Sequence, residues 1–219
     1  STQGYSSAAS DVYKRQERMF GVGDPDHVNR IWFSAQFDPT DFTVSLDAGG
    51  YIDVMGDKGR ALKVVSFSDS VFVFWQYGIT RIKAYNYQSE FTVSDIYNCD
   101  SEILKNSICA CGDQIIFAAK DGIYSFDGYS VQRISDKITG VFNEGLSASG
   151  ECSAYFRGKY YLAVQSSYLE EVEGSLMLEY DTSSNKWRLF KGQAIRQLLV
   201  YHDEGRERLL LLGLSLIHI

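Results

Sequence analysis

Residues Ile108 to Ile134 alternate between short apolar runs and turn residues, and most of the chain repeats this pattern. The four runs are rich in aromatic and β-branched residues, and they are separated by Gly112-Asp113, Asp121-Gly122 and Asp127-Gly128. Such pairs favour tight hairpin turns, because glycine adopts a positive φ without steric cost. The stretch therefore predicts a four-stranded antiparallel meander, the unit of a β-propeller blade, with positive φ at Gly122 and Gly128.

Similar runs occur from Leu62 to Ile96 and from Cys152 to Phe190, and Ile195 to Leu212 begins another copy. Shorter strands are expected at Met19 to Val22, Asn29 to Ser34 and Tyr51 to Val54. Turns recur about every 45 residues, a spacing typical of propeller repeats, near Asp24, Asp69, Asp113, Gly158 and Asp203. We therefore predict an all-β, β-propeller-like fold of repeated four-stranded antiparallel blades, forming a partial, open arc of about four to five blades.

Two segments have a helix-like pattern, Asp100 to Lys105 and Ser135 to Phe142. Each begins with a residue that can cap a helix N-terminus, and each falls between two meanders. We expect single helical turns that link neighbouring blades.

Both ends of the chain resemble translated sequencing adapters. Leu214 to Ile219 (LSLIHI) is the translation of CTG TCT CTT ATA CAC ATC, the mosaic end of transposase-based libraries, and Asp11 to Gln16 (DVYKRQ) is the translation of its reverse complement. Ser6 to Ser10 matches the adjoining adapter arm. Residues 1–16 and 214–219 are therefore expected to be adapter-derived, and 17–213 to be a truncated propeller-like domain.

The composition limits the partners. The chain carries 21 Lys and Arg against 28 Asp and Glu, a net charge of −7, and has no basic stripe. This argues against direct binding of nucleic acid, which requires cations to neutralise phosphates. The apolar C-terminal stretch is too short to span a membrane, so no membrane partner is expected.

Four cysteines, Cys99, Cys109, Cys111 and Cys152, show no C-x-x-C spacing. Cys109 and Cys111 alternate along one predicted strand and should point to the same face. Their neighbours are apolar, which favours reduced core thiols over a metal site or a disulfide.

Candidate catalytic chemistry is sparse. His27 and His202 lie in predicted turns with no second histidine or cysteine nearby, as expected of surface histidines. Propeller-fold glycosidases use acidic residues around a central channel, so carboxylates are the serious alternative, here Asp53, Asp57, Asp69 and Asp113. However, Asp69 and Asp113 stand where a hairpin turn needs aspartate for hydrogen bonds to the backbone. No catalytic residue, cofactor or metal is expected.

The insertion Ser166 to Gly174 is the candidate contact loop, because insertions in repeat proteins map to surface loops that often bind partners. Tyr168 would be an aromatic anchor, and Glu170, Glu171 and Glu173 an acidic rim. A plain solvated loop is the alternative. The segment lacks the alternating oxygen ligands of a calcium loop.

Tyr180-Asp181 and Trp187 resemble the outer-strand signature of kelch repeats, and the two aromatic side chains should pack across a hairpin. Two other passages resemble β-propeller-like virion proteins of tailed bacteriophages, of the tail-accessory or stabilisation type. They are Phe20 to Phe42, with FGVGDP, NRIWFSA and DPTDF, and Asp121 to Ser135.

This resemblance implies a structural, non-enzymatic role in a phage or prophage particle, with other virion subunits as partners and possible self-association. The resemblance implies no active site and no cofactor. Two alternatives remain: a kelch-type or carbohydrate-binding propeller module, and, third, a propeller-fold glycosidase.

Overall fold

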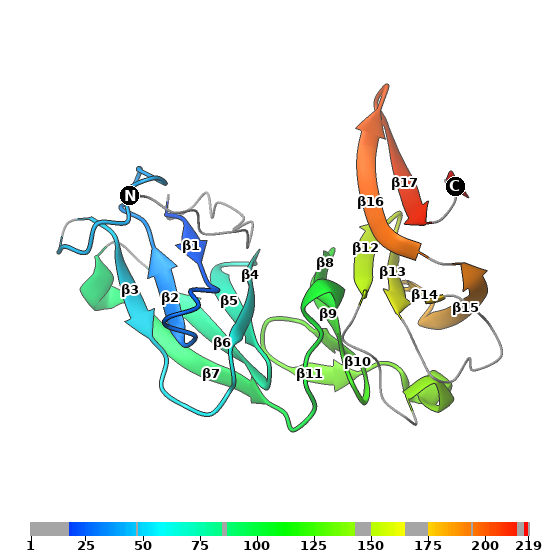
Figure 1. Cartoon of the computed structure of the whole chain (residues 1–219), viewed down its shortest axis with the longest axis horizontal. Helices are drawn as coiled ribbons and strands as arrows, with labels where there is room; N and C mark the ends of the chain where they lie inside the picture. The colour runs from blue at the N-terminus through cyan, green and yellow to red at the C-terminus, as the bar shows by residue number, and fades with distance from the viewer. Residues whose placement is uncertain are drawn as a thin grey trace. The chain divides into compact units, whose positions relative to one another are not determined.

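The computed structural model describes residues 18–46, 48–84, 87–142, 150–164, 175–193, 195–213 and 217–218. The chain forms two compact units, Ser1–Ile103 and Leu104–Ile219. In both units the described strands pair antiparallel with neighbours in the sequence, as the coloured ribbon shows (Figure 1). The predicted all-β class and the four-stranded antiparallel meanders are thus confirmed.

The first unit contains two sheets. The first has the order β1-β2-β3, with β1 (Phe20–Gly21), β2 (Arg30–Phe33) and β3 (Gly50–Asp53). The second has the order β4-β5-β6-β7, with β4 (Ala61–Phe67), β5 (Ser70–Trp75), β6 (Gly78–Lys83) and β7 (Thr92–Asn98). A short 3₁₀ turn, η1 (Gln88–Glu90), precedes β7.

The second unit contains three sheets. Two are four-stranded: β8 (Cys109–Cys111), β9 (Gln114–Ala119), β10 (Gly122–Phe126) and β11 (Val131–Arg133); then β12 (Cys152–Phe156), β13 (Lys159–Val164), β14 (Ser175–Asp181) and β15 (Lys186–Gln193). The third has β16 (Ile195–Asp203), β17 (Arg206–Gly213) and β18 (Ile217–His218).

Inner strands are buried on both faces. β5 is buried at every residue, and β9 and β13 are buried at all but their first. Their sequences, SVFVFW, QIIFAA and KYYLAV, are nearly continuous apolar runs, as expected for strands covered on both sides. By contrast, β2 alternates, with Ile31 and Phe33 fully buried and Arg30 and Trp32 partly exposed. The sheet β1-β2-β3 therefore has one core face and one open face.

In the second unit the first strands of successive sheets lie side by side. β12 contacts both β8 and β16, and it also contacts the 3₁₀ turn η2 (Lys105–Ser107). The buried Tyr160 of β13 donates a hydrogen bond to the carbonyl of Ser107, 2.7 Å away, across this junction. One apolar cluster joins the sheets of β8 and β12, and a second joins those of β12 and β16.

The two helical predictions had different outcomes. Ser135 to Phe142 was close, because a 3₁₀ segment, η3, spans Asp136–Phe142 with a non-helical break at Ile138. The helix expected at Asp100 to Lys105 was wrong, and only the three residues of η2 are helical there. An isolated six-residue segment rarely forms an α-helix, because fixing the backbone dihedral angles of the first turn costs more conformational free energy than its hydrogen bonds contribute.

The expected positive φ holds at Gly128, where φ is 96°, but the expectation for Gly122 was wrong. Gly122 begins β10 in ordinary extended conformation, and a Cβ there would lie 2.8 Å from Nε of Arg133 and 2.9 Å from Oγ of Ser135. A side chain at this position would therefore have to displace the Arg133 guanidinium group and the Ser135 hydroxyl. Gly112 is the other glycine of this meander with a positive φ, of 68°.

All five turns predicted to recur about every 45 residues lie between paired strands. The turns at Asp69, Asp113, Gly158 and Glu204-Gly205 each join the first and second strands of a sheet. The β1–β2 turn, near Asp24, joins the first two described strands of the three-stranded sheet. Ala61, at the start of β4, donates its amide N–H to the carbonyl of Val28, next to this turn.

Leu209 to Leu212 forms part of β17, as expected. Within the segment thought to be adapter-derived, Ile217 pairs with Leu211 and His218 with Leu210. The free edge of β17 thus accepts a short strand, as unpaired edge strands readily do. Among the described residues no helix is long and apolar enough to cross a membrane.

The predicted packing of Tyr180 and Trp187 is confirmed. They are cross-strand partners on β14 and β15, with ring centroids 4.7 Å apart. The β14–β15 turn is held by Asp181, whose Oδ1 accepts hydrogen bonds from the Ser183 N–H (2.9 Å), the Ser183 hydroxyl (2.7 Å) and the Ser184 N–H (3.1 Å). These bonds, first that of the Ser183 hydroxyl, lower the pKa of Asp181 to about 2.

This shift predicts acid sensitivity of the hairpin. A folded-state pKa below the unfolded value stabilises the native state above about pH 4, and the contribution is lost as the pH falls towards 2. Asp181→Asn keeps an oxygen acceptor but does not titrate. Urea midpoints of the wild type and Asp181→Asn, measured between pH 5 and 2, should therefore converge as the pH falls. Parallel curves would contradict the assignment.

Candidate functional site

The predicted contact loop, 166–174, with Tyr168, Glu170, Glu171 and Glu173, lies outside the described residues. The strands on either side of it are as expected: β13 and β14 pair in register from Lys159–Asp181 to Val164–Leu176. The loop therefore remains a prediction.

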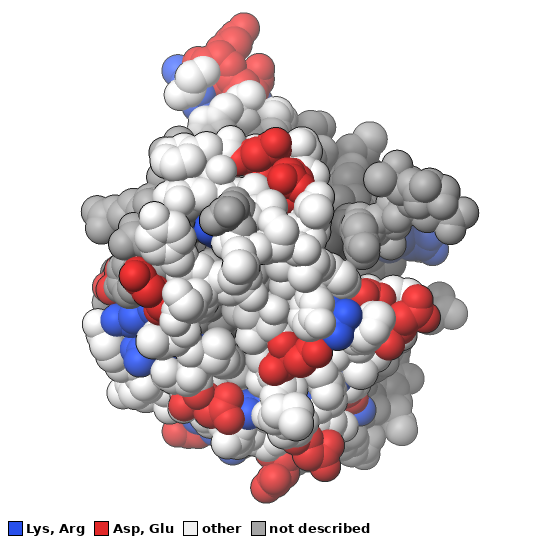
Figure 2. Space-filling model, turned by 90° about the vertical axis from the view of Figure 1, so that its left-hand side faces the viewer, with Lys and Arg blue, Asp and Glu red and all other residues white. Residues whose placement is uncertain are grey.

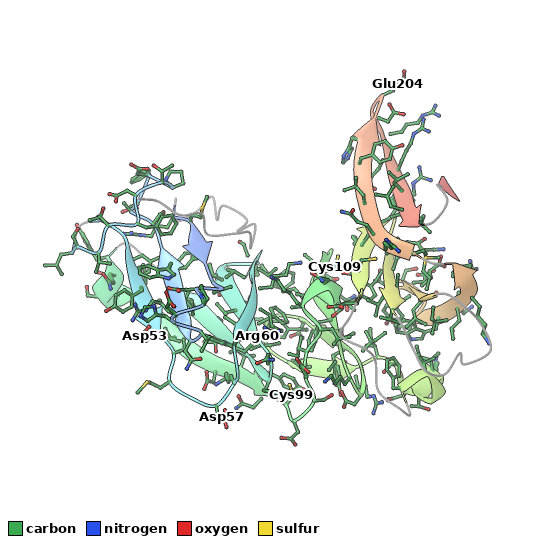
Figure 3. The ribbon with its side chains drawn as sticks, in the orientation of Figure 1. Asp53, Asp57, Arg60, Cys99, Cys109 and Glu204 are labelled. Carbon is green, nitrogen blue, oxygen red and sulfur yellow. The ribbon has the colours of Figure 1, made fainter. Side chains whose placement is uncertain are left out.

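The four candidate carboxylates are not brought together as a catalytic group. Asp53 forms a bidentate pair with Arg30, with Nε and Nη2 at 2.7 and 2.9 Å from its two oxygens. Asp69 accepts a hydrogen bond from the Ser70 hydroxyl at 2.9 Å and lies 3.7 Å from the Lys83 ammonium group. Asp57 is exposed and points outward from the first unit (Figure 3).

The electrostatics of these groups oppose proton transfer. Hydrogen bonds from Arg30 lower the pKa of Asp53, and the hydrogen bond from Ser70 lowers the pKa of Asp69. A carboxyl group acting as a general acid near neutral pH needs a raised pKa. The fourth candidate, Asp113, is exposed in the β8–β9 turn of the second unit. Asp53, a candidate only in the glycosidase alternative, is the partner of an arginine, and Asp69 lies in the β4–β5 turn, where it accepts the hydrogen bond from the Ser70 hydroxyl.

The two histidines are exposed, as expected. The His27 imidazole lies 3.1 Å from Asp24, with 47 % of its side chain exposed, and His202 lies 4.0 Å from Glu207 with 75 % exposed. Within the described ranges, no group of three or more His, Cys, Asp or Glu side chains is arranged to hold a metal ion.

The cysteine prediction holds in part. All four cysteines lie in the described part of the chain, and no disulfide joins them. Cys111 is buried in the core of the second unit, and Cys109 packs against the same cluster, on the same face of β8. The neighbouring Cys109 and burial raise the pKa of the Cys111 thiol, and burial raises that of Cys152 to about 11. Neither is an activated nucleophile. Cys99, Cys109 and Cys152 are only half-buried, so they are not core residues in the full sense.

The open face of the first sheet carries a group that the sequence reading missed. Trp32 and Tyr51 are cross-strand partners with ring centroids 5.5 Å apart, and the Arg30 guanidinium lies 3.7 Å from the Tyr51 ring centroid while it holds Asp53. Asp24 accepts a hydrogen bond of 3.1 Å from Nε1 of Trp32. The alternation of polar and apolar residues along Arg30–Phe33 (RIWF) is the sequence feature that could have indicated this open face.

The sequence pattern also did not indicate the β2–β3 loop, residues 34–49, as a contact surface. It carries three strongly exposed apolar side chains, Phe37 (72 %), Val44 (60 %) and Leu46 (90 %). The sequence identified its Asp-Pro-Thr-Asp turn, but residue type alone does not reveal that these side chains face solvent. Exposed apolar side chains concentrated on one loop mark a contact surface more often than a catalytic one.

The repeated sheets place the chain in the class of all-β proteins built from consecutive antiparallel meanders. No protein-family model and no curated protein matches it. Among solved structures it is similar to the extracellular domain of a putative one-component system from B. thetaiotaomicron, with a TM-score of 0.53 and 13 % identity. The alignment covers 99 % of this chain and 29 % of that chain, so this chain spans less than a third of its neighbour. At this identity the likeness concerns the fold alone.

Proposed function

We propose that this chain belongs to a β-propeller-like protein that acts by protein–protein contact, as a non-enzymatic structural component of a tailed-phage or prophage particle. The main supporting observation for the propeller-like arrangement is the adjacency of first strands in the second unit, where β12 contacts both β8 and β16. Blades arranged around an axis bring their innermost strands together in this way. The middle strands, buried on both faces, are compatible with blades packed face to face.

A contact role accounts for the polar residues without invoking a reaction. Asp53 and Asp69 are held ionised by basic or hydroxyl partners, and Asp181 by its turn. The loop between β2 and β3, in contrast, has three exposed apolar side chains, Phe37, Val44 and Leu46, in the described part of the chain.

The phage assignment rests on sequence similarity. The passage from Phe20 to Phe42 that resembles tail-accessory propellers comprises β1, β2 and the first half of the exposed loop, and Asp121 to Ser135 comprises β10 and β11. Its partners would be other virion subunits, including further copies of the same protein, and its location would be the virion, after synthesis in the bacterial cytoplasm.

Mass spectrometry of particles purified from the source culture tests this proposal. We expect peptides from residues 17–213 to co-purify with capsid and tail proteins at a constant ratio across a density gradient, while an abundant host enzyme does not. The proposal would be wrong if the protein were absent from particles and hydrolysed a polysaccharide, with activity lost in Asp53→Asn or Asp113→Asn and retained in Asp57→Asn.

Carbohydrate binding is the second candidate, favoured by one observation. Tyr51 is 37 % exposed on the open face beside Trp32 and Arg30, and an aromatic ring next to charged groups is a common sugar platform. However, both Asp53 oxygens and the indole N–H of Trp32 already have partners within the chain. Binding to a glycan array that is lost in Tyr51→Ala would favour this candidate. The glycosidase remains third.

A further inference from the structure

Phe37 combines an uncommon backbone conformation with an exposed aromatic ring. Its φ is 63°, in the left-handed region that a residue with a Cβ rarely adopts. Its aromatic side chain is 72 % exposed, so burial within the chain does not compensate the backbone strain. Four other described residues with a Cβ also have a positive φ, and all four lie in turns between paired strands: Ser68, Arg157, Asn185 and Glu204. The positive φ of Phe37 therefore marks a turn, and its distinguishing feature is the exposed aromatic ring at that turn.

The surrounding loop imposes this conformation through a local network. Asp38 Oδ1 accepts hydrogen bonds from the Thr40 N–H (3.0 Å) and the Thr40 hydroxyl (2.7 Å). The carbonyl of Asp41 accepts the Ala35 N–H at 2.7 Å, and its Oδ1 accepts the Thr43 N–H at 2.9 Å. These bonds close the turn directly after Phe37, so the ring is presented on an ordered loop. An ordered anchor loses little conformational entropy when it binds.

The chemistry of the loop indicates its partner. The described residues of the loop include two aspartates, Asp38 and Asp41, and no Lys, Arg or His. Figure 2 views the molecule from the side of β1–β7, where Asp and Glu side chains are scattered over a largely uncharged surface, several of them beside Lys or Arg. An apolar anchor with an acidic surround is complementary to an apolar pocket rimmed by basic residues.

We propose that the β2–β3 loop inserts Phe37 into an apolar pocket bordered by Lys and Arg on a neighbouring protein subunit. This inference rests on the proposed function only in assuming action by protein–protein contact. A second copy of the chain is the less complementary occupant, because the chain carries a net charge of −7 and like charges across an interface repel.

The test uses the full chain and, as probes, the purified products of the open reading frames that flank its gene. Wild-type protein should bind one of them, more weakly at high salt. Phe37→Ser should raise the Kd at least about tenfold, as for a hot-spot residue. Met55→Ser is the matched control, since Met55 is 88 % exposed but outside the loop, and it should leave the Kd unchanged.

A structural readout separates an anchor from a core residue. Phe37→Gly should raise the Tm by about 2–4 °C, because glycine adopts positive φ without strain, while it weakens binding as Phe37→Ser does. A fall in Tm would show that the ring stabilises the fold and would overturn the inference.

The remaining outcomes are distinguishable. If a virion partner binds the Phe37→Ser variant as tightly as the wild type, this inference is wrong and the proposed function is unaffected. A partner outside the virion that requires Phe37 would support the inference and contradict the phage assignment. Failure of the wild type to bind any flanking product, or a Phe37-dependent dimer in sedimentation, would overturn the inference.

Discussion

Replacing Trp75 with alanine should lower the free energy of unfolding by about 3–5 kcal/mol, the range for deleting a buried tryptophan side chain. Trp75 ends β5 and is 1 % exposed in the core of the first unit. Its Nε1 donates a hydrogen bond to the Thr80 hydroxyl at 2.9 Å, so the substitution removes both packing and a buried hydrogen bond. Urea unfolding followed by circular dichroism measures the loss.

Two comparisons make this result specific. Tyr87→Ala removes an aromatic side chain of the same unit that is 66 % exposed, and should change stability by less than about 0.5 kcal/mol. Hydrogen exchange should show that Trp75→Ala lowers protection before Ile103 more than after it, because the two units are separate compact bodies. A loss below about 1 kcal/mol would mean that Trp75 is not in a packed core.

Gly49→Ala should also be strongly destabilising, by about 2–3 kcal/mol, since it overpacks a site that cannot relax easily. A Cβ at Gly49 would lie 2.7 Å from the carbonyl oxygen of Phe33, 2.8 Å from that of Asp41 and 2.8 Å from Cα of Phe42. All three neighbours are backbone atoms, so no side-chain rotation relieves the collision. The same substitution should displace the β2–β3 loop and thereby weaken any binding through Phe37.

Gly21→Ala is the matched control in the same sheet. Nothing lies within 4 Å of a Cβ at Gly21, and its φ is not positive. Loss of chain entropy in the unfolded state should make this variant neutral or more stable, by up to about 1 kcal/mol. Equal destabilisation of the two variants would mean that the loss comes from strand propensity and not from the close approach of the loop to Gly49.

These predictions bear on function because the contact loop is built into the first unit. Gly49 ends the loop and Gly50 begins β3, and a Cβ at Gly50 would meet the Phe33 ring at 2.7 Å. The position of Phe37 therefore depends on the packing of β2 against the start of β3. A protein working by contact needs such a rigid base more than it needs polar chemistry.

Most of the strands could be read from the sequence because their causes are local. Within the predicted meanders, the runs QIIFAA, CSAYF and SLMLEYD form β9, β12 and β14. Period-two and continuous apolar patterns, together with turn residues such as Gly128, act over a few residues. The cross-strand pair of Tyr180 and Trp187 follows from the same hairpin geometry.

The errors lie where distant segments meet. Gly122 was expected to be a turn glycine with a positive φ, whereas it begins β10 and lies against the Arg133 and Ser135 side chains, more than ten residues away. Asp53 was read as a possible catalytic carboxylate, whereas strand register places Arg30 opposite it. A sequence lists both residues without showing that they are neighbours.

The sequence by itself determined the all-β class, the repeated meander and the turns, because alternation and turn chemistry are properties of adjacent residues. Only the tertiary structure decided which face of β2 stays open, why Gly49 must lack a side chain and that Phe37 is exposed in a strained conformation. Exposure and close approach depend on which strands pair and how sheets pack, and these are set by contacts between residues far apart in the chain.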